Sequence, residues 1–195
     1  MIQNNLIKNR APLRLNSINK SNKIIRLLWK FVWIFLFRPS PIFLHKWRCF
    51  LLRLFGANIG KNALPYPTAK IWAPWNLVME DGSCISHNVD CYCVDKITIG
   101  KCSTVSQRTF LCTASHDYSE KLVPLPLLTA PIKIGQYSWI TSEVFIGPGV
   151  SIGDGAIVAA RSVVLNNINP WEVVGGHPAK FIKMRRPNKV DYENS

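Results

Sequence analysis

A repeat of six residues between positions 134 and 165 constrains the fold of this chain more than any other feature. Six aliphatic residues recur at a strict spacing of six: Ile134, Ile140, Ile146, Ile152, Val158 and Val164. Four residues after each of the first five stands a small or β-branched residue: Ser138, Val144, Val150, Ala156 and Ser162. A period of six fits neither a helix of 3.6 residues per turn nor the two-residue alternation of a strand. It fits a chain that turns a corner after each short strand, with the aliphatic residue pointing inward.

Three such hexads close one triangular coil of about 18 residues, and coils stack about 4.8 Å apart through parallel strand pairing. Gly135, Gly147 and Gly153 follow three of the inward residues, and we expect them at tight corners that need a residue without a Cβ atom. The sequence therefore predicts an all-β core, a parallel β-helix of about five coils.

The same period extends upstream, interrupted by two slips in register. The inward positions expected there are Pro65, Ile71 and Leu77, then Met79, Ile85 and Cys91, then Ile99, Val105 and Leu111. Residues 117–131 break the period and contain three prolines, so we expect them to form an excursion loop that leaves a corner directly after His116. In a rigid solenoid, a long excursion is a place where function is often carried.

Positive charge is concentrated at the N-terminal end of the chain. The formal net charge is +13, and residues 1–61 contain twelve Lys or Arg and no Asp or Glu. The rest of the chain is close to neutral, with twelve basic and eleven acidic residues. This distribution predicts an anionic surface as a partner of the N-terminal region.

We divide the chain into four segments. Residues 1–22 are expected to form a basic, poorly ordered arm, and residues 23–56 an amphipathic helical region. Residues 57–170 are expected to form the β-helix, and residues 171–195 a C-terminal tail.

Two interpretations of the helical region can hold together. In the first, the helices cap the open end of the β-helix. In the second, residues 1–56 bind an anionic membrane peripherally, with Trp29, Trp33 and Trp47 at headgroup level. The first apolar run has only about 14 residues before Pro39, fewer than the roughly 20 that are needed to span a bilayer.

The six cysteines show neither a CxxC pair nor a zinc-finger spacing. We expect them to be small buried side chains in a reducing cytoplasm, and no secretory signal peptide is expected. Among four histidines, His45 is expected to face solvent or a phosphate, and His87 and His177 to lie on the surface. His116 differs because it lies at the mouth of the excursion loop, although a single histidine is more often structural than catalytic.

Eight segments carry a resemblance to one family: residues 36–41, 52–57, 71–77, 112–117, 139–140, 148–150, 160–164 and 176–180. In this order they are similar to the hexapeptide-repeat acyltransferases. The closest branch is the colanic-acid-type acetyltransferases of polysaccharide biosynthesis, near the galactoside, maltose and xenobiotic acetyltransferases. The resemblance implies a left-handed superhelix and a homotrimer whose active sites form in the groove between two subunits.

The resemblance also implies roles for individual residues. His116 matches the general base, whose neutral imidazole takes a proton from the acceptor hydroxyl. The oxygen then attacks the thioester of acetyl-CoA directly, and the backbone N–H at Ser142 stabilises the developing oxyanion. Asp117 either orients the imidazole, binds the acceptor or only caps the loop. Cys93 stands where sugar acetyltransferases tend to carry an acceptor-binding asparagine, so Cys93 is expected at the acceptor site, but the acceptor's identity does not carry over.

Other matching residues imply a binding site for the donor. Trp139 matches an aromatic residue that lines the pantetheine tunnel, and Ala160 matches a residue whose backbone meets the pantetheine arm. A group of basic residues in the tail would meet the CoA phosphates: Lys180, Lys183, Arg185 and Arg186.

We therefore expect an acetyl-CoA-dependent O-acetyltransferase that acts on a sugar hydroxyl in envelope polysaccharide synthesis. The expected location is the cytoplasm, with peripheral contact to the inner membrane face, and neither a metal nor nucleic acid is expected as a partner. One alternative is an acetyltransferase for a small amine, amino acid or xenobiotic, and another is a membrane-binding scaffold without catalysis. A metal-dependent β-helix hydratase would need three histidines at an interface, and the coils offer only His87 and His116.

Overall fold

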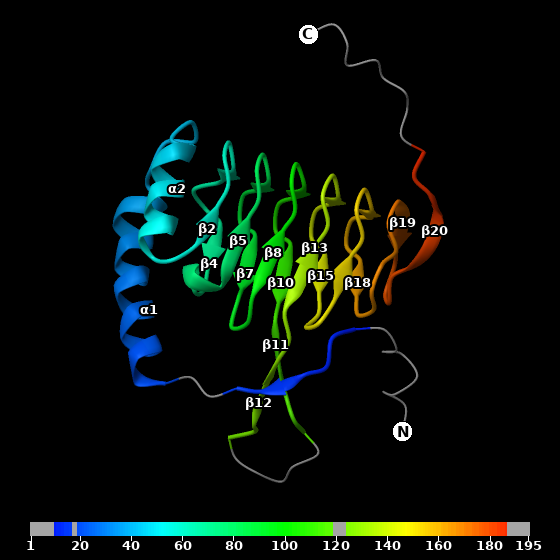
Figure 1. The fold of residues 1–195 in the computed structure, drawn as a ribbon, viewed down its shortest axis with the longest axis horizontal. Helices are drawn as coiled ribbons and strands as arrows, with labels where there is room; N and C mark the ends of the chain where they lie inside the picture. The colour runs from blue at the N-terminus through cyan, green and yellow to red at the C-terminus, as the bar shows by residue number, and fades with distance from the viewer. Residues whose placement is uncertain (1–9, 17–18, 119–123, 187–195) are drawn as a thin grey trace, which may run out of the picture.

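The computed structural model describes residues 10–16, 19–118 and 124–186, and it confirms the predicted parallel β-helix (Figure 1). The first sheet contains β2 (Asn58–Ile59), β5 (Leu77–Met79), β8 (Ile97–Ile99), β13 (Ile132–Ile134) and β16 (Ser151–Ile152). The second contains β3 (Leu64–Pro65), β6 (Cys84–Ile85), β9 (Thr104–Val105), β14 (Trp139–Ile140), β17 (Ile157–Val158) and β19 (Glu172–Gly175), with β20 (Lys180–Met184) antiparallel at its edge. The third contains β4 (Lys70–Ile71), β7 (Asp90–Tyr92), β10 (Phe110–Cys112), β15 (Phe145–Ile146) and β18 (Val163–Val164).

Each coil contributes one strand to each sheet, so five coils are complete and β19 begins a sixth. Every inward position predicted from the period, from Pro65 to Val164, is buried. The first slip in register is taken up at a corner that the short 3-10 helix η3 (Pro74–Asn76) enlarges. Inward residues of successive coils therefore stack into continuous apolar columns that hold the coils together.

The three corner glycines are not equivalent. None of Gly135, Gly147 and Gly153 has a positive φ, so the reason for glycine at these corners is space and not backbone conformation. A Cβ atom on Gly135 would lie 2.6 Å from the backbone nitrogen of Asp154 in the next coil. On Gly147 the nearest atom would be Leu165 Cδ2 at 3.3 Å, which is the end of a side chain. The expectation of a corner without room for a Cβ atom therefore holds for Gly135 more than for Gly147.

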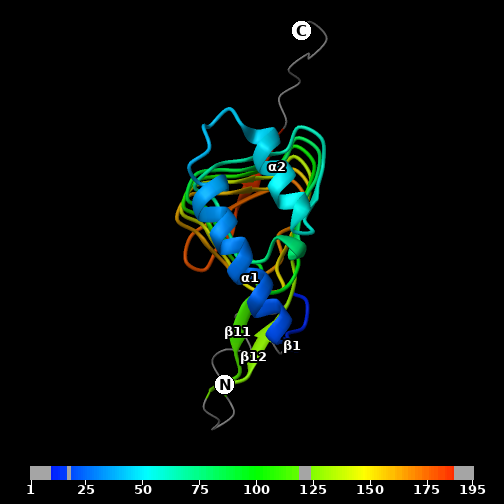
Figure 2. The same cartoon turned by 90° about the vertical axis from the view of Figure 1, so that its left-hand side faces the viewer.

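Helices close the end of the solenoid where the first coil would otherwise be open (Figure 2). They are α1 (Lys20–Val32), the π-helical turn η2 (Trp33–Phe37) and α2 (His45–Leu54). Trp29, Phe37 and Leu52 are buried in the same core as the coils, and the indole Nε1 of Trp29 donates a hydrogen bond to the carbonyl of Ile71 at 2.6 Å. The interpretation of these helices as a cap is therefore confirmed.

Arg48 ties the second helix to the first coil from a fully buried position. Its guanidinium donates hydrogen bonds to the carbonyls of Pro65 (2.7 Å) and Pro41 (2.8 Å) and to the Ser40 hydroxyl (2.9 Å). A buried cation strongly destabilises a protein unless hydrogen-bond acceptors surround it, as they surround the guanidinium of Arg48. Arg48 and the neighbouring half-buried His45, whose Nδ1 lies 3.1 Å from the Pro65 carbonyl oxygen, therefore face the protein and not an anionic surface.

Two predicted segments contain regular structure that the sequence did not indicate. The arm expected to be poorly ordered forms β1 (Arg14–Leu15) and the start of α1, whose N-cap Asn19 accepts a hydrogen bond from the N–H of Asn22 at 2.8 Å. Residues 1–9 and 17–18 of that arm lie outside the described residues. The C-terminal tail likewise starts with β19 and β20, which extend the second sheet beyond β17.

Substitution of Gly135 by alanine should destabilise the protein by about 1–3 kcal/mol, because the added methyl group meets backbone atoms of the neighbouring coil that cannot move independently. The matched substitution Gly147→Ala should have a much smaller effect, because the Leu165 side chain can rotate away. Urea unfolding of both variants measures the difference. Equal destabilisation by the two substitutions would show that coil spacing does not limit these corners.

Candidate active site

The excursion from the third coil is a β-hairpin, and His116 lies on its first strand. β11 (Ala114–His116) pairs antiparallel with β12 (Leu127–Thr129), so the pairing starts three residues before the predicted loop boundary. His116 is in register with Leu127, and residues 119–123 at the turn lie outside the described residues. The hairpin projects away from the solenoid (Figure 1).

One hydrogen bond decides which nitrogen of His116 is open for chemistry. The ring Nδ1 lies 3.2 Å from the carbonyl oxygen of Leu125. A carbonyl oxygen only accepts, so in the neutral ring Nδ1 carries the proton and Nε2 keeps its lone pair. The side chain is exposed, so Nε2 is available to accept a proton from a bound molecule.

The hairpin is held in place by the N-terminal segment, which sequence reasoning missed. β1 pairs antiparallel with β12, and the N–H of Asn16 donates to the carbonyl of Leu127 at 2.9 Å. Before β1, the N–H of Ala11 donates to the carbonyl of Gly149 at 2.9 Å, which anchors the segment on the fourth coil. Because β1 has only two residues, it leaves no periodic signal in the sequence. It is nevertheless the third strand of the small sheet that carries His116.

Asp117 follows His116 directly and is half-buried. Its backbone N–H donates to the carbonyl of Pro126 at 2.9 Å and so extends the pairing of the hairpin by one residue. This contact fixes the backbone of Asp117 in the hairpin, and the role of its carboxylate stays a prediction.

A second group of predicted residues lies at the corner between the second and third sheets. Ser142 and Ala160 are separated by the length of one coil, and the pairing of Trp139 with Ile157 puts them one above the other. The N–H of Arg161 donates to the carbonyl of Ser142 at 3.0 Å. The corner therefore presents a column of backbone groups from successive coils.

The same corner carries a ladder of charges. Glu143 forms ion pairs of 2.6 Å with Arg108 in the coil before it and with Arg161 in the coil after it. The hydrogen bond from Arg161, supported by the charge of Arg108, lowers the pKa of the Glu143 carboxyl group. Both arginine side chains are largely exposed, so the contribution of the two ion pairs to stability is small.

Trp139 stands on the outer face of the second sheet. Its side chain is 49% exposed, and its Nε1 donates a hydrogen bond of 2.9 Å to the hydroxyl of Ser106. Its neighbour in the next coil is Ile157. The indole therefore offers a fixed aromatic edge beside the Ser142 corner, as a wall for a bound molecule requires.

A shallow groove of about 730 Å³ continues this face toward the C-terminal end. Its lining residues come from β17, β19 and β20 and the end of the described chain: Ile157, Val173, Lys183, Met184, Arg185 and Arg186. Lys183 and Lys180 are exposed on β20. Arg185 is partly committed to the fold, because its Nη1 donates to the carbonyls of Tyr137 (2.8 Å) and Gly155 (3.0 Å).

The predicted contact of Cys93 with an acceptor is wrong. Its side chain has no exposed surface, and its thiol forms hydrogen bonds with the backbone of Ala73. Burial raises the pKa of the Cys93 thiol to about 12. The residue fills the core of the second coil, and all six cysteines are free thiols.

The remaining histidines have local partners. The Nδ1 of His87 lies 3.0 Å from the hydroxyl oxygen of Thr68, and Nε2 of His177 contacts the carbonyl of Arg161. In residues 10–16, 19–118 and 124–186, no group of three or more His, Cys, Asp or Glu side chains is placed to hold a metal ion.

A single chain does not bring its two groups of candidate residues together. The hairpin leaves between β10 of the third sheet and β13 of the first, whereas Ser142 lies between β14 of the second and β15 of the third. The width of the third sheet separates these two edges, and the hairpin points away from it (Figure 1). Within one chain, His116 and the Ser142 corner therefore lie on different edges of the third sheet.

Comparison with known proteins shows relatives over nearly the whole chain. The sequence is 43% identical over 164 residues to the putative colanic acid biosynthesis acetyltransferase WcaF of Escherichia coli K12, covering 84% of this chain and 89% of that protein. The hexapeptide-repeat acetyltransferase VCA0836 of Vibrio cholerae, solved with acetyl coenzyme A, superposes with a TM-score of 0.79 at 26% identity, covering 89% of this chain and 93% of that one. A galactoside acetyltransferase in complex with coenzyme A also has a TM-score of 0.79, at 25% identity and 88% and 86% coverage. No family model matches the sequence.

Proposed function

The chain belongs to the hexapeptide-repeat acetyltransferases, and from this premise we propose that it transfers an acetyl group from acetyl-CoA to a sugar hydroxyl in the synthesis of an envelope polysaccharide. The family makes it an acyltransferase with acetyl-CoA as the donor. The names of its relatives, one assigned to colanic acid and one to a galactoside, support a sugar as the acceptor. The observation that carries the proposal is the exposed Nε2 of His116, left unprotonated by the contact with Leu125.

In the proposed reaction, Nε2 of His116 removes the proton from the acceptor hydroxyl as the oxygen attacks the thioester carbonyl. The C–S bond then breaks, and the protonated imidazole returns the proton to the CoA thiolate. The backbone N–H of Ser142 would stabilise the negative oxygen of the intermediate. The Leu125 carbonyl stabilises the charged ring, since it accepts from Nδ1 throughout the cycle.

A homotrimer would complete this site. Within each chain, the hairpin and the Ser142 corner lie on opposite edges of the third sheet. In a closed cyclic assembly with identical interfaces, the hairpin of one subunit could therefore meet the Ser142 corner of the next. Trp139 and Ala160 would then line the path of the pantetheine arm. Lys180 and Lys183 would meet the CoA phosphates, while Arg185 would contribute through the donors that Tyr137 and Gly155 leave open.

The cap helices are proposed to rest on an anionic membrane. Large apolar side chains cover their outer face: Ile24, Leu27, Leu28, Phe31, Phe35, Leu36, Phe43 and Phe50 are each between 46% and 79% exposed. Exposed lysines Lys20, Lys23, Lys30 and Lys46 accompany them. Within the described part of the chain, none of the helices is long and apolar enough to cross a membrane. An interfacial position, with apolar side chains in the lipid and lysines at the headgroups, accounts for this surface.

Substitution of His116 by alanine should lower kcat by roughly 10²–10⁴-fold, because it removes the general base. The measurement is acetyl transfer from acetyl-CoA to a galactoside, together with a titration of CoA binding. CoA affinity should not change, since His116 is assigned to the acceptor's proton and not to a contact with CoA. The matched control is Ser115→Ala, which is exposed on the same strand and should keep wild-type turnover. Turnover of the His116→Ala variant within threefold of wild type would remove this residue from catalysis.

The double substitution Phe31→Glu, Phe35→Glu should abolish sedimentation with anionic vesicles at low salt. These rings are 55% and 66% exposed and stack on each other at 6.4 Å, so the change affects the outer face without opening the core. The wild-type protein should bind such vesicles and dissociate at high salt, because each lysine near the surface contributes about 1 kcal/mol of screened attraction.

The control for this experiment is Phe181→Glu, Ile182→Glu on β20, where the side chains are equally exposed at 57% but lie at the other end of the solenoid. This variant should sediment like the wild type. Wild-type protein that stays in the supernatant with anionic vesicles at low salt would show that the helices act only as a cap.

A further inference from the structure

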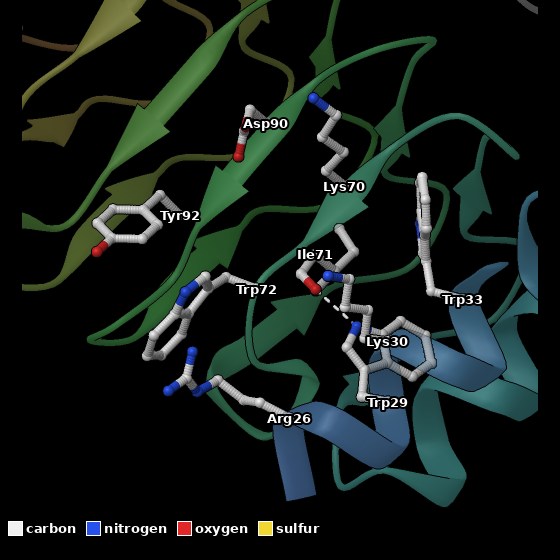
Figure 3. A pocket seen from close by; sticks show the side chains of 9 residues that line it. All are labelled: Arg26, Trp29, Lys30, Trp33, Lys70, Ile71, Trp72, Asp90 and Tyr92. Atoms are coloured by element: carbon white, nitrogen blue, oxygen red, sulfur yellow. Dashed lines mark hydrogen bonds between the residues drawn. The ribbon is translucent and has the colours of Figure 1, made fainter. Parts of the chain in front are cut away.

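A pocket of about 350 Å³ lies between the first cap helix and the third sheet, and the proposed reaction does not use it. Its walls come from α1 on one side and from β4 and β7 on the other (Figure 3). The indole nitrogens of Trp29 and Trp33 donate to the carbonyls of Ile71 (2.6 Å) and Ala69 (2.8 Å), which fixes the helix against the sheet. The pocket is therefore a preformed feature of the fold.

Three cations line the pocket: Arg26, Lys30 and Lys70. In the described residues, neither Lys30 nor Lys70 forms an ion pair. Arg26 lies with its guanidinium 4.1 Å from the centroid of the Trp72 ring, which holds it in position without neutralising its charge. Several positive charges around one concave site are suited to a phosphate or diphosphate group.

The other lining residues suit a sugar. The rings of Trp72 and Tyr92 meet edge to face at 5.5 Å and form an aromatic wall that a pyranose ring can pack against. Asp90, two residues before Tyr92 on the same strand, supplies a carboxylate that can accept hydrogen bonds from sugar hydroxyls. Partial burial raises the pKa of the Asp90 carboxyl group. The nearby positive charge of Lys70 opposes this shift, which shows that Lys70 and Asp90 interact electrostatically.

The pocket also lies between the apolar face of the cap and the strand that carries His116. Leu27, Leu28 and Phe31 are exposed on the same helix that contributes Arg26 and Lys30. On the other side, the carbonyl of Tyr92 accepts hydrogen bonds from the N–H (3.2 Å) and hydroxyl (2.8 Å) of Thr113. Thr113 stands three residues before His116, a distance of about 10 Å along an extended strand.

We propose that this pocket binds the phosphate-linked sugar of the acceptor, with Lys30, Lys70 and Arg26 on the phosphate and Trp72 and Asp90 on the sugar. This inference rests on the proposed function and narrows its acceptor to a sugar carried on a phosphate or diphosphate. Such a group occurs in lipid-linked glycans and in nucleotide sugars. The apolar surface beside the pocket suits the first source, and the test compares both.

The test is isothermal titration calorimetry of the full-length protein with three probes: galactose linked to farnesyl diphosphate, UDP-galactose, and methyl galactoside without phosphate. The double substitution Lys30→Gln, Lys70→Gln should raise the Kd for the diphosphate probes by roughly tenfold or more, because it removes charge-assisted hydrogen bonds. The Kd for methyl galactoside should not change.

The matched control is Lys96→Gln, Lys133→Gln, which removes two exposed lysines from the first-sheet side of the same solenoid. This variant should bind all three probes like the wild type. Tighter binding of the farnesyl probe than of UDP-galactose would assign the pocket to a lipid-linked acceptor, and the reverse order to a nucleotide sugar. Affinity of the pocket variant within twofold of wild type for both diphosphate probes, or an equal loss in the control, would overturn the proposal.

Calorimetry measures binding without turnover, so the two proposals can fail separately. If the wild-type protein binds a diphosphate probe through Lys30 and Lys70 but transfers no acetyl group to any sugar, the pocket is correct and the reaction is not. If acetyl transfer to galactosides proceeds and the pocket variant binds every probe normally, the reaction is correct and the pocket is not its acceptor site.

Discussion

Stacking of inward aliphatic side chains between coils is the interaction on which the rest of this structure depends. The inward residues from Ile71 to Val164 pack against their equivalents in the neighbouring coils, and parallel backbone pairing fixes the spacing between them. Because the coils cannot slide, residues one coil apart are aligned on the same edge, as Ser142 and Ala160 are. The solenoid thus supplies rigid edges, and the candidate general base His116 lies on a hairpin where the chain departs from the repeat.

The open end of a solenoid exposes its apolar core, and in this chain the helices that cover this end also form a second apolar surface. The inner face of the cap buries Trp29 and Phe37 in the common core, while the outer face of the same helices exposes Leu27 and Phe31. A helix with apolar side chains on both its inner and its outer face needs a partner for each of the two faces. The protein core is one partner, and a lipid surface would be the other. The same helices can therefore cap the solenoid with their inner face and contact a membrane with their outer face.

The features that depend on the six-residue repeat could be predicted from the sequence. The coil architecture, the register of the inward residues and the position of the excursion all follow from spacing, and the structure confirms them. Pairing between distant segments was not predictable, because β1 has two residues and its partner β12 is more than a hundred positions away. Individual side chains were also missed where tertiary contacts decide their role. Arg48 belongs to the basic N-terminal region and is nevertheless buried, and Cys93, expected at the acceptor site, fills the core.

The central claim is that the active site joins the hairpin of one subunit to the coil corner of another, and mixed assemblies test it most directly. Two variants are made: His116→Ala removes the base, and Ala160→Trp obstructs the exposed corner proposed for the pantetheine arm. Each variant alone should be inactive. In trimers assembled from equal amounts of the two, about one interface in four combines an intact hairpin with an intact corner, so roughly a quarter of wild-type activity should return. Mixed trimers as inactive as the two parent variants would contradict a site shared between subunits.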